Sequence, residues 1–494
     1  MNSKLITILL SAFFTTPSMA QTPASGLKLD VEAQGTAATG DFAPLWLSSN
    51  RYGMGSTKNL NGYERISLMR TEVNDSTKNW RLGYGLDMAV QEGSTSTVLI
   101  QQAFASIAYK KIRLIIGSKE QPMDLKNQEL SSGGLSLGIN SHPIPQVRME
   151  IDYFSIPGTR QWWKWKMRGS YGKTTDGNWQ KSATTEVFRY TNNHLYHEKA
   201  VYWKFGKEEF KKCPLTFELG IQMATQFGGT TYNATGRNVP VPTTIEHKEN
   251  LNAFWNALIC GGNDETDGTE KNVAGNHLGS YNMALAWTAE NWMIRAYAER
   301  YFEDQSMITL QYGVQDHLLG IEGKLPKNPL VTSIVLEHMS TRNQSGAVYH
   351  DQSANIPDKM NGRDNYYNHY LYAGWQHWGM GIGNPLITSP LYSSHGYVYF
   401  DNNRVKAWHI GLSGEPTTEI HWRMLLSFTE NWGTYNEPFK EKQLQQYYLA
   451  EVSYYPQWSK GWNGKLAIGY DHGGVIGNSL GAQLTINKSF NLIK

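Results

Sequence analysis

Two serines stand in the Gly-x-Ser-x-Gly pattern that can present a nucleophilic hydroxyl group. Ser136 lies in GLSLG (residues 134–138) and Ser479 in GNSLG (residues 477–481). A nucleophile elbow needs a strand-to-helix turn, followed along the chain by an acid and a histidine. Ser479 instead opens the last alternating segment with no histidine after it, and Ser136 lies in a glycine-rich loop. We therefore expect no hydrolase and no enzyme of another kind.

The residues that bind metals or cofactors are sparse. His194 and His197 have no further ligands at metal-binding spacing, and no phosphate-binding loop of the GK[ST] type is present. Cys213 falls in a short connection and Cys260 in a long one, on opposite sides of the topology argued below, so the two thiols are expected to stay free. We expect no metal and no other cofactor.

Binding features are richer than catalytic ones. Residues 110–173 carry eleven Lys and Arg against five Asp and Glu, with Trp162, Trp163 and Trp165 among them. Cations beside planar rings suit an acidic polysaccharide, since rings stack on apolar sugar faces and cations meet carboxylates. In the alternative interpretation, the tryptophans belong to a membrane-interface girdle and the cations line a lumen or touch lipid headgroups.

The stretch 341–402 mixes aromatic rings with amide side chains. We take five of its residues as candidate polysaccharide contacts, because rings stack on sugars and amides hydrogen-bond to hydroxyl groups. The five are Trp375, Trp378, Tyr366, Tyr367 and Asn365. The alternative is that these side chains pack the loop.

The composition excludes several classes of protein. The 494 residues have a formal net charge of +2, which argues against a nucleic-acid binder driven by charge, and two cysteines cannot form a disulfide scaffold. Lys4, the apolar run 5–14 and the small residues Ser18 and Ala20 predict a cleaved signal peptide over residues 1–20. The remainder, 21–494, is expected to form one domain.

Many segments of about ten residues alternate strictly between apolar and polar side chains. From Leu215 the odd positions are apolar to Met223, and from Ile420 the even positions are apolar to Phe428. No later stretch is apolar enough to span a membrane as a helix. Alternation of this length, with aromatic ends, predicts a transmembrane antiparallel β-barrel; a soluble sandwich is the alternative.

Eighteen such segments can be placed, and the even number agrees with both termini lying in the periplasm. They are 27–38, 61–73, 80–92, 98–110, 112–119, 146–156, 162–172, 198–208, 214–226, 279–290, 291–303, 313–323, 329–340, 403–414, 418–430, 444–455, 463–471 and 478–490. Residues 397–400 are assigned to a loop. The long connections, 39–60, 120–145, 173–196, 227–278 and 341–402, all fall on one side, as expected of external loops in the bacterial outer membrane.

Residues 113–160 resemble the signature segment of the Wzi family of capsule-assembly outer-membrane proteins. A strand ends at Gly117, and a serine-rich piece, an asparagine and a Pro-x-Pro then lead into the next strand. The residues that carry this motif are Ser131, Ser132, Asn140, Pro143, Pro145 and Arg148. Residues 43–53, 192–203 and 381–392 are similar to other elements of the family.

The resemblance implies an eighteen-stranded outer-membrane barrel that acts as a lectin, with no catalysis. Its partners would be capsular polysaccharide or exopolysaccharide and outer-membrane lipid, and capsule-export machinery is a further candidate. Loop 120–145, stiffened by its prolines, is expected to fold inward and close the lumen. A porin that conducts saccharides is the alternative function.

Overall fold

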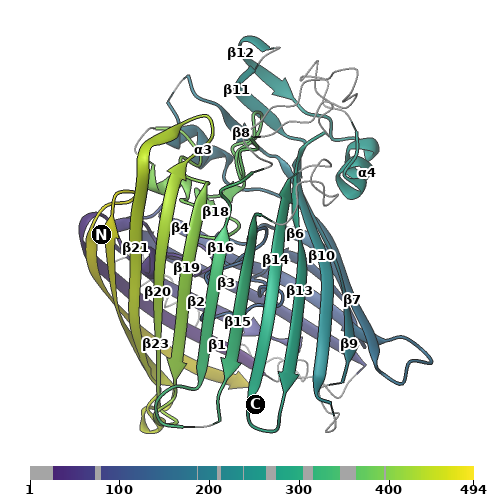
Figure 1. The fold of residues 1–494 in the computed structure, drawn as a ribbon, viewed down its shortest axis with the longest axis vertical. Coiled ribbons are helices and arrows are strands. Elements are labelled where there is room, and N and C mark those ends of the chain that lie inside the picture. Colours follow the sequence, from purple (N-terminus) through teal and green to yellow (C-terminus); the bar gives the residue numbers. More distant parts are fainter. Residues whose placement is uncertain are drawn as a thin grey trace, which may run out of the picture.

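A computed structural model describes residues 26–72, 79–185, 187–207, 213–236, 239–262, 274–303, 315–326, 328–344, 363–393 and 396–493. Eighteen antiparallel strands form one sheet that closes into a barrel, because β1 pairs with both β2 and β23 (Figure 1). Within the described part, no helix has the length and apolar character needed to cross a membrane. The expected signal peptide, 1–20, lies outside the described residues.

The wall of the barrel follows the order of the chain. Its strands are β1 (Leu27–Phe42), β2 (Lys58–Arg70), β3 (Trp80–Glu92), β4 (Val98–Tyr109), β5 (Ile112–Ser118), β6 (Gln146–Ser155), β7 (Trp163–Lys173), β9 (Leu195–Gly206), β10 (Leu215–Phe227), β13 (Asn276–Thr288), β14 (Met293–Glu303), β15 (His317–Lys324), β16 (Ser333–Ser340), β19 (Val405–Gly414), β20 (Ile420–Gly433), β21 (Pro438–Tyr454), β22 (Trp462–Gly473) and β23 (Ser479–Ile493). Each predicted segment overlaps one of these strands, so the fold class and the strand count are confirmed. Residues 397–400 lie in a loop, also as predicted.

The long external connections hold short elements of their own. They contain α2 (Leu45–Ser48), α3 (Gly177–Ala183), α4 (Leu251–Ile259) and the 3-10 helix η3 (Pro390–Tyr392). A small sheet joins β8 (Tyr190–Asn192), β11 (Thr230–Gly236) and β12 (Val239–Glu246), and β17 (Gln376–His377) pairs with β18 (Met380–Gly381). In Figure 1 these pieces gather at the end of the barrel away from the short turns.

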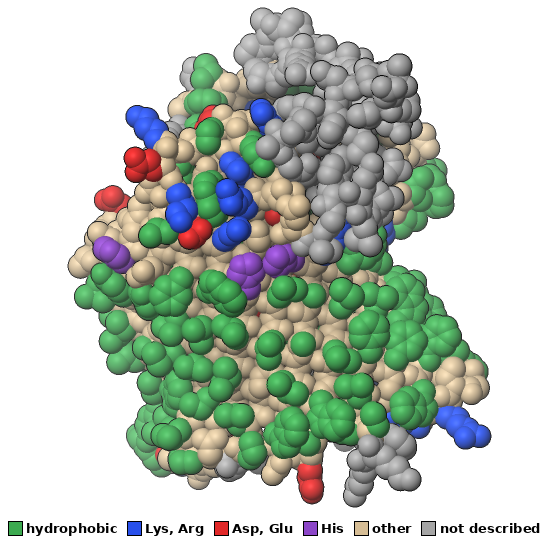
Figure 2. Space-filling view, in the orientation of Figure 1, with side chains coloured by type: hydrophobic (Ala, Val, Ile, Leu, Met, Phe, Trp, Pro, Cys, Tyr) green, Lys and Arg blue, Asp and Glu red, His purple; other side chains and the backbone are tan. Residues whose placement is uncertain are grey.

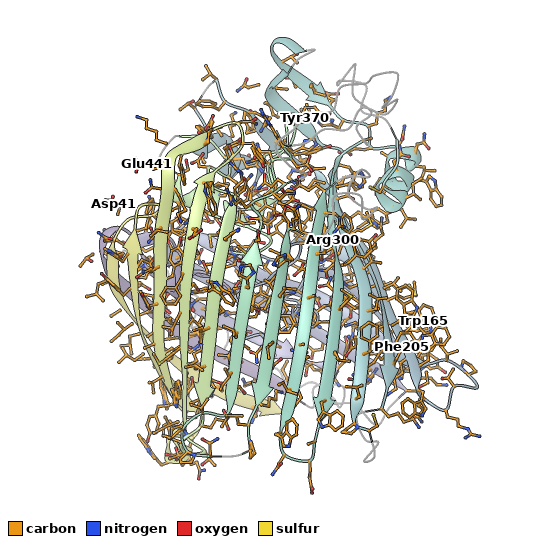
Figure 3. All side chains as sticks on the ribbon, in the orientation of Figure 1. Asp41, Trp165, Phe205, Arg300, Tyr370 and Glu441 are labelled. Atoms are coloured by element: carbon orange, nitrogen blue, oxygen red, sulfur yellow. The ribbon has the colours of Figure 1, made fainter. Side chains whose placement is uncertain are left out.

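The two faces of the wall differ as the alternation predicts. Side chains such as Ile100, Ile321 and Leu484 are about half exposed on the outside, and Figure 2 shows a broad apolar belt of hydrophobic side chains across the face in view. Trp165 and Phe205 also point outward from the wall (Figure 3). Polar and charged side chains line the inside, as in membrane barrels. The chain therefore forms a barrel of the outer-membrane type.

Candidate functional site

Loop 119–145, between β5 and β6, crosses the lumen instead of projecting outward. The Lys126 ammonium lies 2.6 Å from the Glu299 carboxylate of β14, and both side chains are buried. The Leu130 carbonyl lies 2.8 Å from the imidazole Nε2 of His409 on β19, which stands across the ring from β5. The loop thus folds inward across the lumen, as predicted, and is held on the far side of the barrel.

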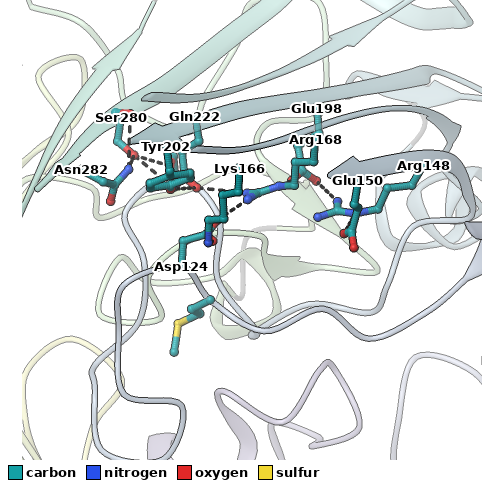
Figure 4. A network of polar contacts seen from close by, with 12 residues as sticks. Asp124, Arg148, Glu150, Lys166, Arg168, Glu198, Tyr202, Gln222, Ser280 and Asn282 are labelled. Atoms are coloured by element: carbon teal, nitrogen blue, oxygen red, sulfur yellow. Dashed lines mark hydrogen bonds and ion pairs between the residues drawn. The ribbon is translucent and has the colours of Figure 1, made fainter. Parts of the chain in front are cut away.

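A chain of ion pairs ties the same loop to the near wall (Figure 4). Asp124 of the loop lies 2.7 Å from Lys166 and also pairs with Arg168, both on β7. Glu198 of β9 then lies 2.6 Å from Arg168 and 3.1 Å from Arg148. Burial alone would raise the pKa of Asp124, but Arg168 and Lys166 outweigh burial and hold this pKa well below its ordinary value. Asp124 is therefore a charged anchor of the loop.

A second segment, 363–393, packs on top of this loop inside the barrel mouth. The Trp375 indole N–H donates to the Ser136 carbonyl at 2.7 Å. The Tyr367 hydroxyl donates to the Leu135 carbonyl and accepts from the Asn384 backbone N–H at 3.0 Å. These bonds join the two segments into one body, which we call the plug.

The plug corrects the prediction for three of the five candidate sugar contacts. The side chains of Trp375, Tyr366 and Tyr367 are at most 1% exposed. A ring can stack on a sugar only if one of its faces is open, and these faces are covered by protein. The structure therefore gives the three rings a packing role, which was the alternative reading of this loop.

Asn365 also has its hydrogen-bonding groups engaged within the protein. Its amide nitrogen donates to the Tyr399 hydroxyl at 2.8 Å, and its amide oxygen accepts from Asn403 at 2.6 Å and from Asn368 at 3.0 Å. The side chain is half-buried. These bonds make it a support of the plug rather than a group open to a ligand.

The serines and the asparagine of the family motif hold the plug to the wall and to itself. Ser131 donates its hydroxyl to the Glu337 carboxylate of β16 at 2.6 Å, and the Ser132 backbone N–H reaches the same carboxylate at 2.8 Å. The Asn140 amide donates to the Gly381 carbonyl at 3.0 Å. The motif thus serves closure of the lumen in this structure.

The remaining motif residues join the plug to the strands beside it. The Pro143 carbonyl accepts from the Ser118 hydroxyl at 3.1 Å, and the Pro145 carbonyl accepts from the Lys173 backbone N–H at 3.1 Å. Arg148 belongs to the network of Figure 4. Like the serines, these residues hold the loop in its position inside the barrel.

Three of the family-like segments meet inside the barrel. Asn50, from 43–53, donates its amide to the Ser132 carbonyl at 3.0 Å. Asn384, from 381–392, donates its amide to the Gly133 carbonyl at 3.0 Å. Far apart in sequence, the segments that carry the resemblance are adjacent in the plug.

Above the plug, five external connections enclose a cavity of about 260 Å³. Two indoles, a phenol ring, one cation and several hydroxyl groups line it. Its lining includes Trp179, Trp378, Tyr397, Lys58, Ser56, Thr57 and Ser94. No Asp or Glu is among the described lining residues. The cavity thus combines planar rings with neutral and basic polar groups.

The Trp378 side chain is partly exposed, whereas that of Trp375, three residues earlier, is fully buried. Its backbone N–H donates to the Asp176 carboxylate at 3.1 Å, and its indole N–H lies 3.2 Å from the Thr175 hydroxyl. Its ring remains half-buried at the cavity wall. These two bonds fix the orientation of the indole and leave part of the ring open to the cavity.

The histidine below Trp378 adds no charge to the cavity. The ring centroids of His142 and Trp378 lie 6.4 Å apart, edge to face. Burial, with a smaller contribution from His377, lowers the pKa of His142 to about 3. The imidazole is neutral at physiological pH, which leaves Lys58 as the described cation in the lining.

The sequence did not single out Trp179, Lys58 or Tyr397 as parts of this site. Trp179 and Lys58 fall outside the aromatic-rich stretch 341–402 that marked Trp378, and Tyr397 lies within that stretch but was assigned only to a loop. A solitary tryptophan in a long external loop is the signal that could have found Trp179.

For the basic segment 110–173, the structure supports the second interpretation, in which the tryptophans belong to a membrane-interface girdle and the cations line the lumen. Arg113, Arg148 and Arg168 point into the lumen and pair with carboxylates of neighbouring strands. Trp163 stacks against Phe205 near the short-turn end of the barrel, with ring centroids 5.7 Å apart. The tryptophans therefore belong to the girdle, and these arginines belong to the wall.

The serines and cysteines that were set aside have structural surroundings. The Ser136 hydroxyl lies 2.7 Å from the Gln222 amide and 3.2 Å from the Glu299 carboxylate, inside the plug. The Ser479 hydroxyl lies 2.6 Å from the Thr39 carbonyl and 2.7 Å from the Phe42 carbonyl, both at the end of β1. Cys213 and Cys260 are not joined in a disulfide, as predicted.

Comparison with solved structures places this fold beside a known barrel. The chain is similar to Wzi of Escherichia coli, described as an outer membrane protein involved in group 1 capsule assembly and a carbohydrate-binding β-barrel. The TM-score is 0.56 at 14% identity, over 99% of this chain and 88% of that one. This similarity confirms at the level of the fold the resemblance found in the sequence.

Other bacterial barrels match less well. OccK5 (OpdH) of Pseudomonas aeruginosa gives a TM-score of 0.45 at 7% identity, over 94% of this chain and 98% of that one. OprD of the same organism gives 0.44 at 8% identity, over 94% and 95%. No family model matches the chain, and no curated protein sequence matches it either.

Proposed function

We propose that the protein binds polysaccharide at the outer surface of the outer membrane and helps attach or assemble it there. The observation that carries this proposal is the cavity above the plug, with two indoles among hydroxyl groups. Indole faces stack on the apolar faces of sugar rings, and hydroxyl groups exchange hydrogen bonds with those of the sugar. No catalytic step is part of this function.

The charge of the cavity favours neutral or acidic glycans. Lys58 is exposed at its edge, and the described lining carries no carboxylate to repel an anion. A polymer with many repeats would engage many barrels at once, so weak contacts at each cavity add up to firm attachment. Capsular polysaccharide and exopolysaccharide both have this repeating character.

A saccharide-conducting porin is the competing function. The bonds that hold loop 119–145 across the lumen support binding over conduction, because a permeating solute would have to displace the buried Lys126–Glu299 pair. In planar bilayers we expect the wild-type protein to give no conductance above background. Steady single-channel currents that sugars block would favour the porin.

The binding site is tested by removing its indoles. Glycan arrays with detergent-purified Trp179→Ala and Trp378→Ala should each show a roughly five- to tenfold loss of binding relative to wild type, since each exposed stacking contact contributes about 1–1.5 kcal/mol. The matched control is Trp458→Ala, which removes a 77% exposed indole from a short turn at the opposite end. In cells, the two cavity variants should release polysaccharide into the medium.

Wild-type glycan retention by both cavity variants, with folding intact, would refute this site. Equal losses in the Trp458→Ala control would point instead to a general effect of removing an indole.

A further inference from the structure

A groove runs along β14 on the outside of the barrel, within the apolar belt. Its floor is made of Ala296 and Ala298, which face outward between larger side chains of the neighbouring strands. Met283 on β13 and Leu319 on β15 are the partners of Ala298 in the sheet and form the two ridges. The groove has a volume of about 640 Å³ and a lining that is almost entirely apolar.

A histidine and a tryptophan border this groove on the side of β16 and β19. His338 of β16 and Trp408 of β19 are direct cross-strand partners, with ring centroids 4.7 Å apart. Both line the groove. Two residues closer to the external loops, on the same outward face of β19, stands Lys406. The apolar surface therefore ends directly beneath a cation.

Two arginines extend this positive charge beyond Lys406. The Arg342 guanidinium lies 4.5 Å from the centroid of the Trp432 ring, and that of Arg404 lies 3.8 Å from the centroid of Tyr435. Arg404 also donates from its Nε to the Arg342 carbonyl at 3.2 Å. The aromatic contacts hold both guanidinium groups at the surface, where Figure 2 shows cations gathered just above the belt.

These cations differ from those inside the barrel. Within the described part of the chain, neither Arg342 nor Arg404 nor Lys406 forms an ion pair with a carboxylate. Glu430, the cross-strand partner of Lys406, pairs instead with Lys442 at 2.9 Å. Carboxylates of the wall pair with the arginines in the lumen. The charges of Arg342, Arg404 and Lys406 on the outside stay available to a ligand.

We propose that the groove and the three cations form one binding site for a phosphorylated glycolipid of the outer leaflet. An acyl chain lies in the groove along β14, and the phosphate groups meet Lys406, Arg404 and Arg342. Guanidinium forks match phosphate oxygens in geometry, and three cations without an ion pair in the described part of the chain suit a ligand with more than one phosphate. The position of the groove inside the apolar belt selects a lipid over a free phosphate ion.

The site is tested by lipid retention in the folded protein. Purified barrel is exchanged into detergent, mixed with lipid A, and analysed by native mass spectrometry for bound lipid. The combined variant Arg342→Gln, Arg404→Gln, Lys406→Gln should bind the lipid roughly tenfold more weakly than wild type. The matched control is Lys442→Gln, because this cation on the same face is already paired with Glu430.

Two further measurements test the groove and the phosphate contacts separately. Ala298→Phe fills the groove and should also weaken lipid A binding, while leaving the cations untouched. Dephosphorylated lipid A, offered to the wild-type protein, should bind as weakly as lipid A binds to the triple variant. This arm needs no variant and tests the proposal even if the triple variant fails to fold.

Equal retention of lipid A and its dephosphorylated form by the wild-type protein would overturn the proposal. So would an effect of Lys442→Gln as large as that of the triple variant, which would indicate general surface charge.

Discussion

Residues three positions apart in one external segment have different roles in this barrel. Trp375 is fully buried and donates a hydrogen bond to Ser136, whereas Trp378 opens onto the cavity. Both stand in the same aromatic-rich run, and no local pattern tells them apart. Burial here depends on which distant segment packs over each ring, so the sequence could predict the aromatic run but not the role of each member.

Replacing the two tryptophans should therefore give opposite results. Trp375→Ala removes a fully buried indole and should lower the free energy of unfolding by about 3–5 kcal/mol, because it leaves a cavity in the plug. Trp378→Ala should change stability little and reduce glycan binding. Urea unfolding of the lipid-reconstituted barrel, followed by tryptophan fluorescence, measures the first effect. Comparable stability losses in both variants would contradict these assignments.

At the scale of elements, loop 119–145 is the part that turns an open barrel into a closed one. Its prolines predict an inward fold, and that prediction is confirmed. The partners on the wall, such as Glu299 and Glu337, could not be paired with loop residues from the sequence. Their spacing fixes which face of a strand they occupy, but not which residue of the loop they meet.

Breaking one buried contact of this loop should loosen the plug. Lys126→Met leaves the Glu299 carboxylate buried without its partner, which costs about 3–5 kcal/mol. We expect intermittent conductance in planar bilayers, in contrast to the wild-type protein, for which we expect none above background. The double variant Lys126→Met, Glu299→Leu removes both charges and should show less conductance than Lys126→Met alone. If the Lys126→Met variant folds normally and shows no conductance, the other contacts of the loop are enough to keep the lumen closed.

The anchoring of Asp124 predicts how the plug responds to acid. Its pKa in the folded protein lies below that of an unfolded chain, about 3.9, so its contribution to stability is complete above that pH. The contribution is lost as pH falls through the lowered folded pKa. The difference in plug stability between wild type and Asp124→Asn should thus be largest near neutral pH and shrink below about pH 4.

Hydrogen exchange of the loop amides, measured from pH 7 down to pH 3, follows this difference between wild type and Asp124→Asn. A difference that grows on acidification would contradict the sign of the lowered pKa.

At the scale of the whole molecule, alternation along the strands was the most informative signal. It predicted all eighteen strands, because one outward apolar face and one inward polar face repeat with a period of two. Strand ends were less accurate: β1 runs to Phe42 and β21 begins at Pro438, both beyond the predicted limits. Above the membrane the wall no longer needs an apolar outside, so the alternation fades while the hydrogen bonds of the sheet continue.

The outward belt predicts that the purified protein needs an amphiphile. In detergent it should be monodisperse and, without heating, should migrate faster in SDS gels than after boiling. Removal of detergent should cause aggregation, because the apolar belt would face water. Sedimentation with and without detergent measures this; a folded, monodisperse protein in plain buffer would contradict the membrane assignment.

The seam between β1 and β23 has a consequence for biogenesis. β1 is the first strand of the wall along the chain and β23 is the last, so the cylinder cannot be sealed until β23 has been synthesised. Until then the unsealed sheet has two edges that could join with other chains. Closure of the barrel is therefore the last step of its assembly, and both edges need protection from other chains until that step.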